Sequence, residues 1–174
     1  LHPDKTPWFT LEEADTIVLG LFDAVLMRKD PPFNMEFFYA TQLLELAQEQ
    51  GAVVVNNPIA LRNYNEKLAI LRHTDWIAPT VVSSQMPVLR HFIEEQGDVI
   101  LKPLDGMGGA GIFRVSPQDP NLSVILETIT AHNQQTIMAQ QYIPAISRGD
   151  KRILLINGSP VPYSLARIPA QGET

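Results

Sequence analysis

Short apolar runs alternate with a longer amphipathic stretch over the first third of the chain. Residues 24–27 and 52–55 are apolar throughout, a pattern typical of strands that are buried on both faces. Between them, apolar side chains recur near the helical period over about residues 35–50. The apolar positions of that expected helix are Phe38, Leu43, Leu44 and Ala47. A strand, a helix and a second strand in this order predict a parallel pair joined by a crossover.

Polar residues and glycine mark the ends of these elements. Asn34 stands where a helix N-cap belongs, and Gly51 stands where that helix is expected to stop. The run Asn-Asn-Pro at 56–58 breaks the pattern, and we interpret it as a linker. We therefore divide the chain into an α/β region, residues 1–63, and a second region, residues 64–174.

The second region mixes helical and strand patterns and predicts an α+β fold with mostly antiparallel pairs. The expected helices cover about residues 65–72, 86–96 and 122–132, with Asn65 and Ser84 as the caps of the first two. The expected strands cover residues 80–82, 99–102, 112–115, 136–140, 153–156 and 160–166. Asn157-Gly158 between the last two strands is typical of a two-residue hairpin turn.

The densest glycine cluster lies between two of these strands. Four of the ten glycines fall within residues 106–111, directly after the apolar strand that ends in Lys102. Glycine costs backbone entropy, so this density indicates positive φ or a close approach of the backbone to another group. The amides of such a turn suit an anion, typically a phosphate. We interpret the segment as a cover over nucleotide phosphates, with Lys102 adding a positive charge.

Two other phosphate loops are excluded by the residues that come after the glycines. The spacing Gly-x-Gly-x-x-Gly from residue 106 matches the dinucleotide fingerprint, which needs a helix directly afterwards. Residues 112–115 alternate like a strand instead. A P-loop needs Lys and Ser or Thr where this chain has Ile and Phe. A flap between two strands is left, with a plain flexible hairpin turn as the alternative.

Composition narrows the possible functions further. A net charge of −6 and a pI near 5.1 argue against a nucleic-acid surface. No apolar run approaches the roughly 20 residues that span a bilayer. The absence of cysteine excludes thiol catalysis, disulfides and cysteine zinc sites. The four histidines are scattered without ligand spacing, and the acidic residues form no compact metal cluster.

Several polar residues outside the glycine cluster are candidate ligand contacts, each with a plainer alternative. Lys67 and Arg167 can bind an anion, or they are solvated charges. Residues 140–143 leave a strand, where backbone groups can pair with an adenine edge, although a core strand explains them as well. The charged run at 150–152 is either functional or a solvated turn.

Five stretches, taken in order, carry a more specific signal: residues 26–33, 65–68, 101–109, 149–152 and 165–169. Together they resemble bacterial glutathione synthetase, an ATP-grasp ligase, over essentially the whole chain. The resemblance implies a partial ATP-grasp fold in residues 64–174, where ATP lies between two antiparallel sheets. It also implies that residues 1–63 are part of a parallel-sheet α/β substrate domain that precedes it.

The resemblance also implies an activity, partners and site residues. The family joins γ-glutamylcysteine to glycine through an acyl phosphate, using ATP and Mg²⁺. This implies a cytoplasmic homo-oligomer with no nucleic-acid or membrane partner. The implied ATP contacts are Lys67, Lys102, Gly106, Met107, Gly108, Gly109, Gln140, Gln141, Tyr142, Ile143 and Asp150. Arg152 and Arg167 are the implied catalytic residues, and together with Arg28 they would bind the peptide substrate.

This sequence departs from the family pattern in length and at one position. The family is nearly twice as long, and its Mg²⁺ ligands are expected downstream of Thr174. We therefore expect the 174-residue chain to be inactive in ligation on its own and to bind ATP weakly. Asn34 stands where relatives often carry Asp. Three alternatives stay open, namely another ATP-grasp carboxylate–amine ligase, a non-catalytic ATP-binding module and a scaffold without a ligand.

Overall fold

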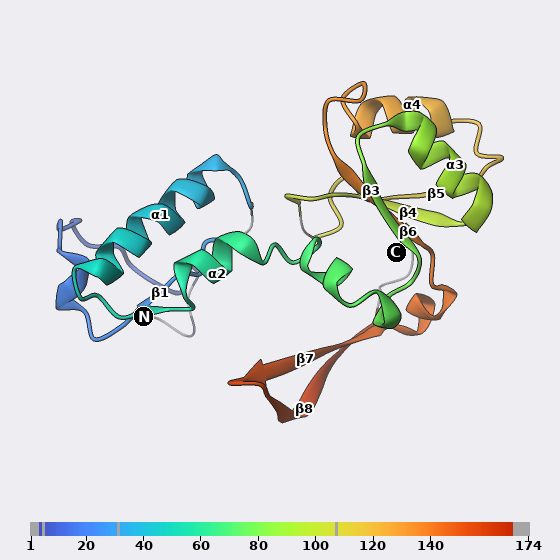
Figure 1. Ribbon diagram of the computed structural model, residues 1–174. Coiled ribbons are helices and arrows are strands. Elements are labelled where there is room, and N and C mark those ends of the chain that lie inside the picture. The colour runs from blue at the N-terminus through green and yellow to red at the C-terminus, as the bar shows by residue number, and fades with distance from the viewer. Residues whose placement is uncertain (1–3, 5, 31, 107, 169–174) are drawn as a thin grey trace. The chain divides into compact units, whose positions relative to one another are not determined.

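The computed structural model describes residues 4, 6–30, 32–106 and 108–168. Contacts between residues divide the chain into two units (Figure 1). The first unit comprises residues 1–30 and 35–63, and the second comprises residues 31–34 and 64–174. In the described part of the chain, no helix is both long and apolar enough to cross a membrane.

The first unit contains the expected parallel crossover. Strand β1 (Val25–Leu26) pairs in parallel with β2 (Val54–Val55), and α1 (Met35–Glu49) lies between them in the chain. A short 3₁₀ helix, η1 (Leu19–Leu21), precedes β1. The unit's small core consists of Leu44, Ala52 and Val54, with Leu19, Val25, Met27 and Ala47 packed against it. The strand–helix–strand prediction is therefore confirmed, with shorter strands than expected.

The buried face of α1 differs from the predicted one. Phe37, Thr41 and Leu44 are the buried residues of this helix, whereas Leu43 is 64% exposed. Spacings of four and three keep the buried residues on one stripe, and Leu43 falls outside it. The Thr41 hydroxyl donates to the Phe38 carbonyl at 2.7 Å, so its burial leaves no polar atom unsatisfied. Of the apolar positions expected in this helix, Leu44 is in the core and Ala47 packs against it, whereas Leu43 takes no part.

The prediction of a linker at residues 56–58 is also wrong, because a helix, α2 (Pro58–Asn63), begins at Pro58. Asn57 Oδ1 accepts hydrogen bonds from the amides of Ile59 and Ala60 at 2.9 and 3.3 Å. An Asn cap followed by Pro at the first position is a favourable helix start. Asn57 and Pro58, which interrupt the strand pattern after β2, therefore begin α2.

A four-stranded sheet forms the centre of the second unit. The strands are β3 (Thr80–Ser83), β4 (Val99–Pro103), β5 (Phe113–Val115) and β6 (Ile137–Gln141), all antiparallel, in the order β3-β6-β4-β5. Helices α3 (Met86–Gln96) and α4 (Leu122–Ile129) lie on the same side of this sheet (Figure 1). The core between them comprises Leu89, Ile93, Val99, Leu101, Val115, Leu122, Leu126, Ile129, Ile137 and Ala139. The opposite face of the sheet is thus not covered by these helices.

Helix ends in the second unit differ from the predicted ones. The helix expected over 65–72 is a turn followed by the 3₁₀ helices η2 (Ala69–Arg72) and η3 (Thr74–Trp76). Ser84 does not cap α3; the Met86 amide donates instead to Asn133 Oδ1 at 2.7 Å. Helix α4 ends at Ile129 rather than near residue 132, because residues 131–133 have positive φ, which does not continue a right-handed helix.

The remaining elements form a separate hairpin. After a 3₁₀ helix, η4 (Pro144–Arg148), strands β7 (Asp150–Ile156) and β8 (Ser159–Arg167) pair antiparallel. Asn157 and Gly158 connect them with φ values of 48° and 79°. Positive φ at both central residues is the requirement of a type I′ turn, so the predicted hairpin is confirmed.

Candidate functional site

Polar side chains lie on the uncovered face of the four-stranded sheet. Val99 and Leu101 are fully buried in the core, and successive side chains of a strand point to opposite faces. Ile100 and Lys102 therefore point to the uncovered face. Gln140 pairs with Ile100 on one side and with Thr80 on the other. Three adjacent strands thus place Thr80, Gln140 and Lys102 on the same face.

The ammonium group of Lys102 is held by a neutral partner. Its Nζ donates to Gln140 Oε1 at 2.8 Å. Burial lowers the pKa of Lys102 below its usual 10.5, and repulsion from the Lys67 ammonium lowers that pKa further. The lowered pKa of Lys102 therefore has two causes, its own burial and the positive charge of Lys67.

Lys67 joins the glycine turn to the segment that follows the first unit. Its side chain is only 14% exposed, and its Nζ donates to the Gly106 carbonyl at 2.6 Å and pairs with Glu66 at 2.9 Å. Asn65 supports this arrangement twice. Its Nδ2 donates to the Leu104 carbonyl at 3.2 Å, and its Oδ1 accepts from the Lys67 amide at 3.0 Å. The lysine is therefore fixed beside the turn.

The glycine turn has the backbone geometry that its sequence predicted. Gly108, Gly109 and Gly111 have φ values of 67°, 82° and 69°. Gly106 lies outside the left-handed region and contributes its carbonyl to Lys67. Met107, a predicted ATP contact, lies outside the described residues. The prediction of positive φ is confirmed for three of the four glycines.

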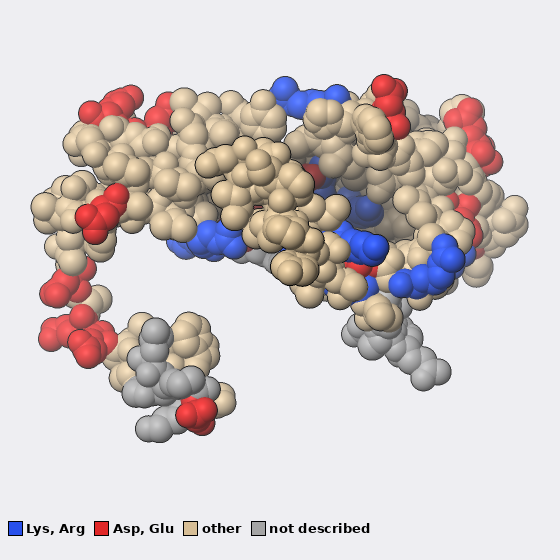
Figure 2. All heavy atoms as spheres, turned by 90° about the horizontal axis from the view of Figure 1, so that it is seen from below, with Lys and Arg blue, Asp and Glu red and all other residues tan. Residues whose placement is uncertain are grey.

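Lys67 and Lys102 are partly buried positive charges, which favour a bound anion nearby. Two ammonium groups repel each other, and an anion between them turns both interactions attractive. Figure 2 shows Lys and Arg side chains around and within a hollowed part of the surface, at the right of that view. The arrangement is chemically suited to phosphate oxygens.

The segment that follows β6 has contacts of its own. They include Arg114 and Asp98, two residues that the sequence analysis did not single out. The amides of Gln141 and Tyr142 each donate at 2.9 Å, to the carbonyls of Pro79 and Asp98. The Arg114 guanidinium lies 3.9 Å from the Tyr142 ring centroid and bonds Asp98 at 2.6 Å. This hydrogen bond raises the pKa of Arg114 above its usual value. Ile143, the last predicted contact of this segment, is exposed.

The predicted residues of the hairpin pair with each other. Asp150 lies opposite Arg167 in the β7–β8 register, and the two side chains form a two-point ion pair. The hydrogen bond from Arg167 lowers the pKa of the Asp150 carboxyl. Arg152 is exposed and lies opposite Leu165, two residues from Asp150. Arg28 is exposed just after β1, in the first unit.

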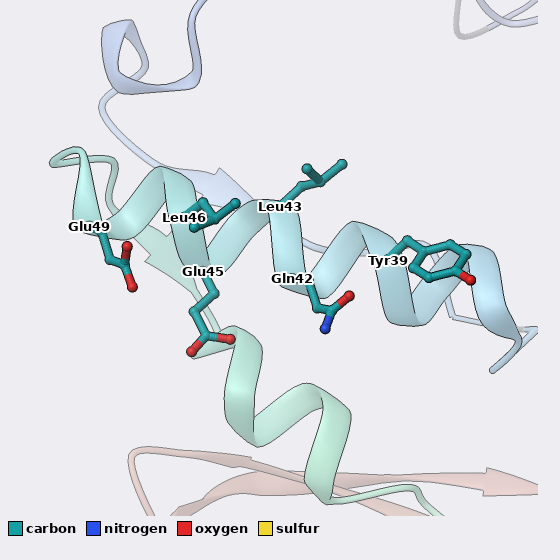
Figure 3. A pocket seen from close by; sticks show the side chains of 6 residues that line it. All are labelled: Tyr39, Gln42, Leu43, Glu45, Leu46 and Glu49. Atoms are coloured by element: carbon teal, nitrogen blue, oxygen red, sulfur yellow. The ribbon is translucent and has the colours of Figure 1, made fainter.

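The described residues contain no metal cluster, and a groove on α1 lies apart from the predicted site residues. Among the described residues, no three His, Cys, Asp or Glu side chains are grouped so as to hold a metal ion. An open groove runs along one side of α1 (Figure 3) and is lined by Tyr39, Gln42, Leu43, Glu45, Leu46 and Glu49. None of the predicted site residues lines it. We therefore take the uncovered sheet face, Lys67 and the glycine turn as the candidate site.

The fold is that of a class of proteins, the ATP-grasp proteins. The chain is similar to D-alanyl-alanine synthetase A from Vibrio cholerae (TM-score 0.63, 17% identity, 86% of this chain and 47% of the other). It is also similar to a RimK domain ATP-grasp protein from Sphaerobacter thermophilus (TM-score 0.55, 26% identity, 78% of this chain and 51% of the other).

The sequence comparisons identify the family within that class. The family model of the prokaryotic glutathione synthetase N-terminal domain matches residues 1–62, and that of the ATP-grasp domain matches residues 66–174. The chain belongs to the prokaryotic glutathione synthetase family. It is 60% identical over 171 residues to glutathione synthetase from Pseudomonas syringae pv. tomato, and 56% identical over 173 residues to that from Neisseria meningitidis serogroup B. These matches cover 98% and 99% of this chain, but it spans about half the length of those curated relatives, 54% in each case.

Proposed function

We propose that this chain serves the ATP-dependent ligation of γ-glutamylcysteine to glycine, which forms glutathione. The observation that supports it most is the position of two lysines: Lys67 Nζ donates to the carbonyl of Gly106 in the turn with three left-handed glycines, and Lys102, on the strand before that turn, has only a neutral acceptor, Gln140. Family membership supports the choice of substrates. Without family membership, the geometry of the lysines and the glycine turn would support only nucleotide binding.

The proposed reaction needs no nucleophile from the protein. The carboxylate of γ-glutamylcysteine attacks the γ-phosphorus of ATP; a new O–P bond forms, and the bond to the bridging oxygen breaks to release ADP. The glycine amine then attacks the acyl carbon, an amide bond forms, inorganic phosphate leaves, and the amine gives up a proton. The protein's task is to align the reactants, neutralise the phosphoryl charge and exclude water from the acyl phosphate.

The described residues divide this task between them. Lys67 and Lys102 would neutralise phosphate oxygens, and the glycine turn would cover them. The adenine would lie along the exit of β6, at residues 140–143. Asp150 would lie near the nucleotide, and Arg152 and Arg167 would bind the peptide substrate or the acyl phosphate, with Arg28 on the substrate side.

Mg²⁺, when bound, would supply further positive charge to the phosphates. The described residues offer no ligand cluster for it, so no step is assigned to it. A cytoplasmic location and a homo-oligomeric state are further expectations of the family resemblance.

Calorimetry with a non-hydrolysable ATP analogue and Mg²⁺ tests the nucleotide part of this proposal. Release of ADP from ATP on adding γ-glutamylcysteine and glycine tests the ligation. This release is best measured on the longest natural protein that carries this chain. Release with other acids, but not with γ-glutamylcysteine, would point to another ATP-grasp ligase. Binding without any release would point to a non-catalytic module. Absence of binding in that longer protein would refute the proposed site.

A further inference from the structure

Two hydrogen bonds connect Lys102 to Thr80, a residue that no motif singles out, and a third holds the Thr80 hydroxyl. Lys102 Nζ donates to Gln140 Oε1 at 2.8 Å, and Gln140 Nε2 donates to Thr80 Oγ1 at 2.9 Å. The Thr80 hydroxyl in turn donates to the Ala78 carbonyl at 2.7 Å. The three side chains come from three adjacent strands of the sheet and are all partly buried.

The donor directions in this chain of hydrogen bonds are fixed at its two ends, by the Lys102 ammonium and by the Ala78 carbonyl. An ammonium can only donate, so Gln140 must turn its oxygen toward Lys102 and its NH₂ toward Thr80. The Thr80 oxygen must then accept, which leaves its own proton for the Ala78 carbonyl. No reversed arrangement satisfies all the groups. The orientation of the Gln140 amide is thus determined from both sides.

The partner of Lys102 is neutral, which matters for a group that binds an anion. A half-buried ammonium needs an acceptor to replace lost hydration. A carboxylate would provide one but would also cancel the positive charge, whereas an amide oxygen leaves that charge in place. The amide needs a fixed orientation, because a flipped amide would present NH₂ to the ammonium.

We propose that Thr80 is a positioning residue, which acts through Gln140 to hold the Lys102 ammonium on the face where phosphate binds. The phosphate part of this inference rests on the proposed function; the positioning of Lys102 does not. If Thr80 were only a strand-forming residue, valine of the same shape would replace it without effect on Lys102.

The first experiment measures the titration of Lys102 by NMR in protein carrying ¹³C-labelled lysine, with Lys102→Met identifying the signal. Thr80→Val removes the hydroxyl, so we expect the pKa of Lys102 to fall below its wild-type value, because the charged form loses its oriented acceptor. Thr80→Ser keeps the hydroxyl and should restore the wild-type titration. Equal titration curves in wild type and Thr80→Val would overturn the proposal, as would equal shifts in the Val and Ser variants.

A second variant guards against misfolding of Thr80→Val. Gln140→Met removes the acceptor itself while keeping a side chain of similar length, and we expect the same downward change in the Lys102 titration. Adding Thr80→Val to Gln140→Met should then cause no further change, because both act through one chain. A further change of similar size in the double variant would show that Thr80 acts independently of Gln140 and would overturn the proposal.

Calorimetry with the non-hydrolysable ATP analogue and Mg²⁺ gives the second readout. We expect Thr80→Val to weaken binding about fivefold, the scale of one neutral hydrogen bond, and Thr80→Ser to bind like wild type. A shifted Lys102 titration with unchanged affinity would overturn the link to phosphate. No binding by the wild type, with the titration shift intact, would overturn the proposed function and leave the positioning role standing.

Discussion

Lys102 and Lys67 are held in different ways, although both face the same candidate anion site. Lys102 has only a neutral amide acceptor, whereas Lys67 contacts a carbonyl of the glycine turn and the exposed carboxylate of Glu66. Both lysines stand out in the sequence as candidates, because one ends an apolar strand and the other follows Asn65, whose side chain accepts from its amide. Thr80 and Arg114 could not be predicted, because Gln140, the partner of Thr80, lies on another strand, and Tyr142, the partner of Arg114, lies just beyond one. The register that brings them together is not visible in sequence.

Replacing either lysine by methionine should weaken binding of the Mg²⁺–ATP analogue at least about tenfold, since each loses one charge-assisted contact to phosphate. Calorimetry measures this directly. Arg90→Met is the matched control, because Arg90 lies on α3, on the covered side of the sheet, where it bonds Ser123. Equal losses in all three variants would show a general charge effect instead of a phosphate site.

The lowered pKa of Lys102 has a consequence for stability against pH. The folded state binds this proton less tightly than the unfolded state, whose reference value is 10.5. The unfolded state therefore holds more protons between the folded pKa and 10.5, and stability rises with pH across that window. Urea unfolding gives the free energy of unfolding of wild type and of Lys102→Met. The wild-type value minus the variant value should increase as pH rises toward 10.5. If this stability difference does not change with pH, the pKa of Lys102 is not lowered in the folded protein.

At the scale of elements, the backbone of the glycine turn combines two constraints. Gly109 and Gly111 both have positive φ, but only Gly111 is also crowded: an added Cβ would lie 3.0 Å from Pro103 Cγ, whereas Gly109 has nothing within 4 Å. The sequence predicted the first constraint from glycine density alone. The second depends on how the turn folds back on β4. The cap of α3 is a similar case, since Asn133 lies 47 residues from Met86.

Gly111→Ala should therefore destabilise the protein more than Gly109→Ala does. Both variants place a side chain in the left-handed region, at a cost of about 1–2 kcal/mol each. Gly111→Ala adds the contact with Pro103, so its midpoint of urea unfolding should be the lower of the two. Gly20→Ala, with open space and no positive φ, serves as the control. Equal midpoints for the Gly109 and Gly111 variants would mean that Pro103 yields without cost.

At the scale of the whole molecule, burial is uneven among the elements. Strands β4 and β6 contribute Val99, Leu101, Ile137 and Ala139 to a core that two helices cover. The hairpin of β7 and β8 instead exposes its apolar side chains, among them Ile153, Leu155 and Leu165 at 59%, 61% and 60%. The sequence predicted both sets of strands from apolar runs. It could not tell which set is packed, because the patterns of the runs are alike while their tertiary neighbours differ.

Hydrogen exchange should therefore separate these strands. A two-stranded hairpin without a packed face is marginally stable in water, so amides of residues 150–167 should exchange with solvent through frequent local opening. Amides of residues 99–103 and 137–141 should exchange only through larger unfolding events, because opening them exposes the core. Mass spectrometry of peptides from the two regions measures the difference at one pH and temperature. Protection of the hairpin equal to that of β4 and β6 would mean that a further surface covers it in solution, and the exposed side chains of β7 and β8 would then mark where that surface packs.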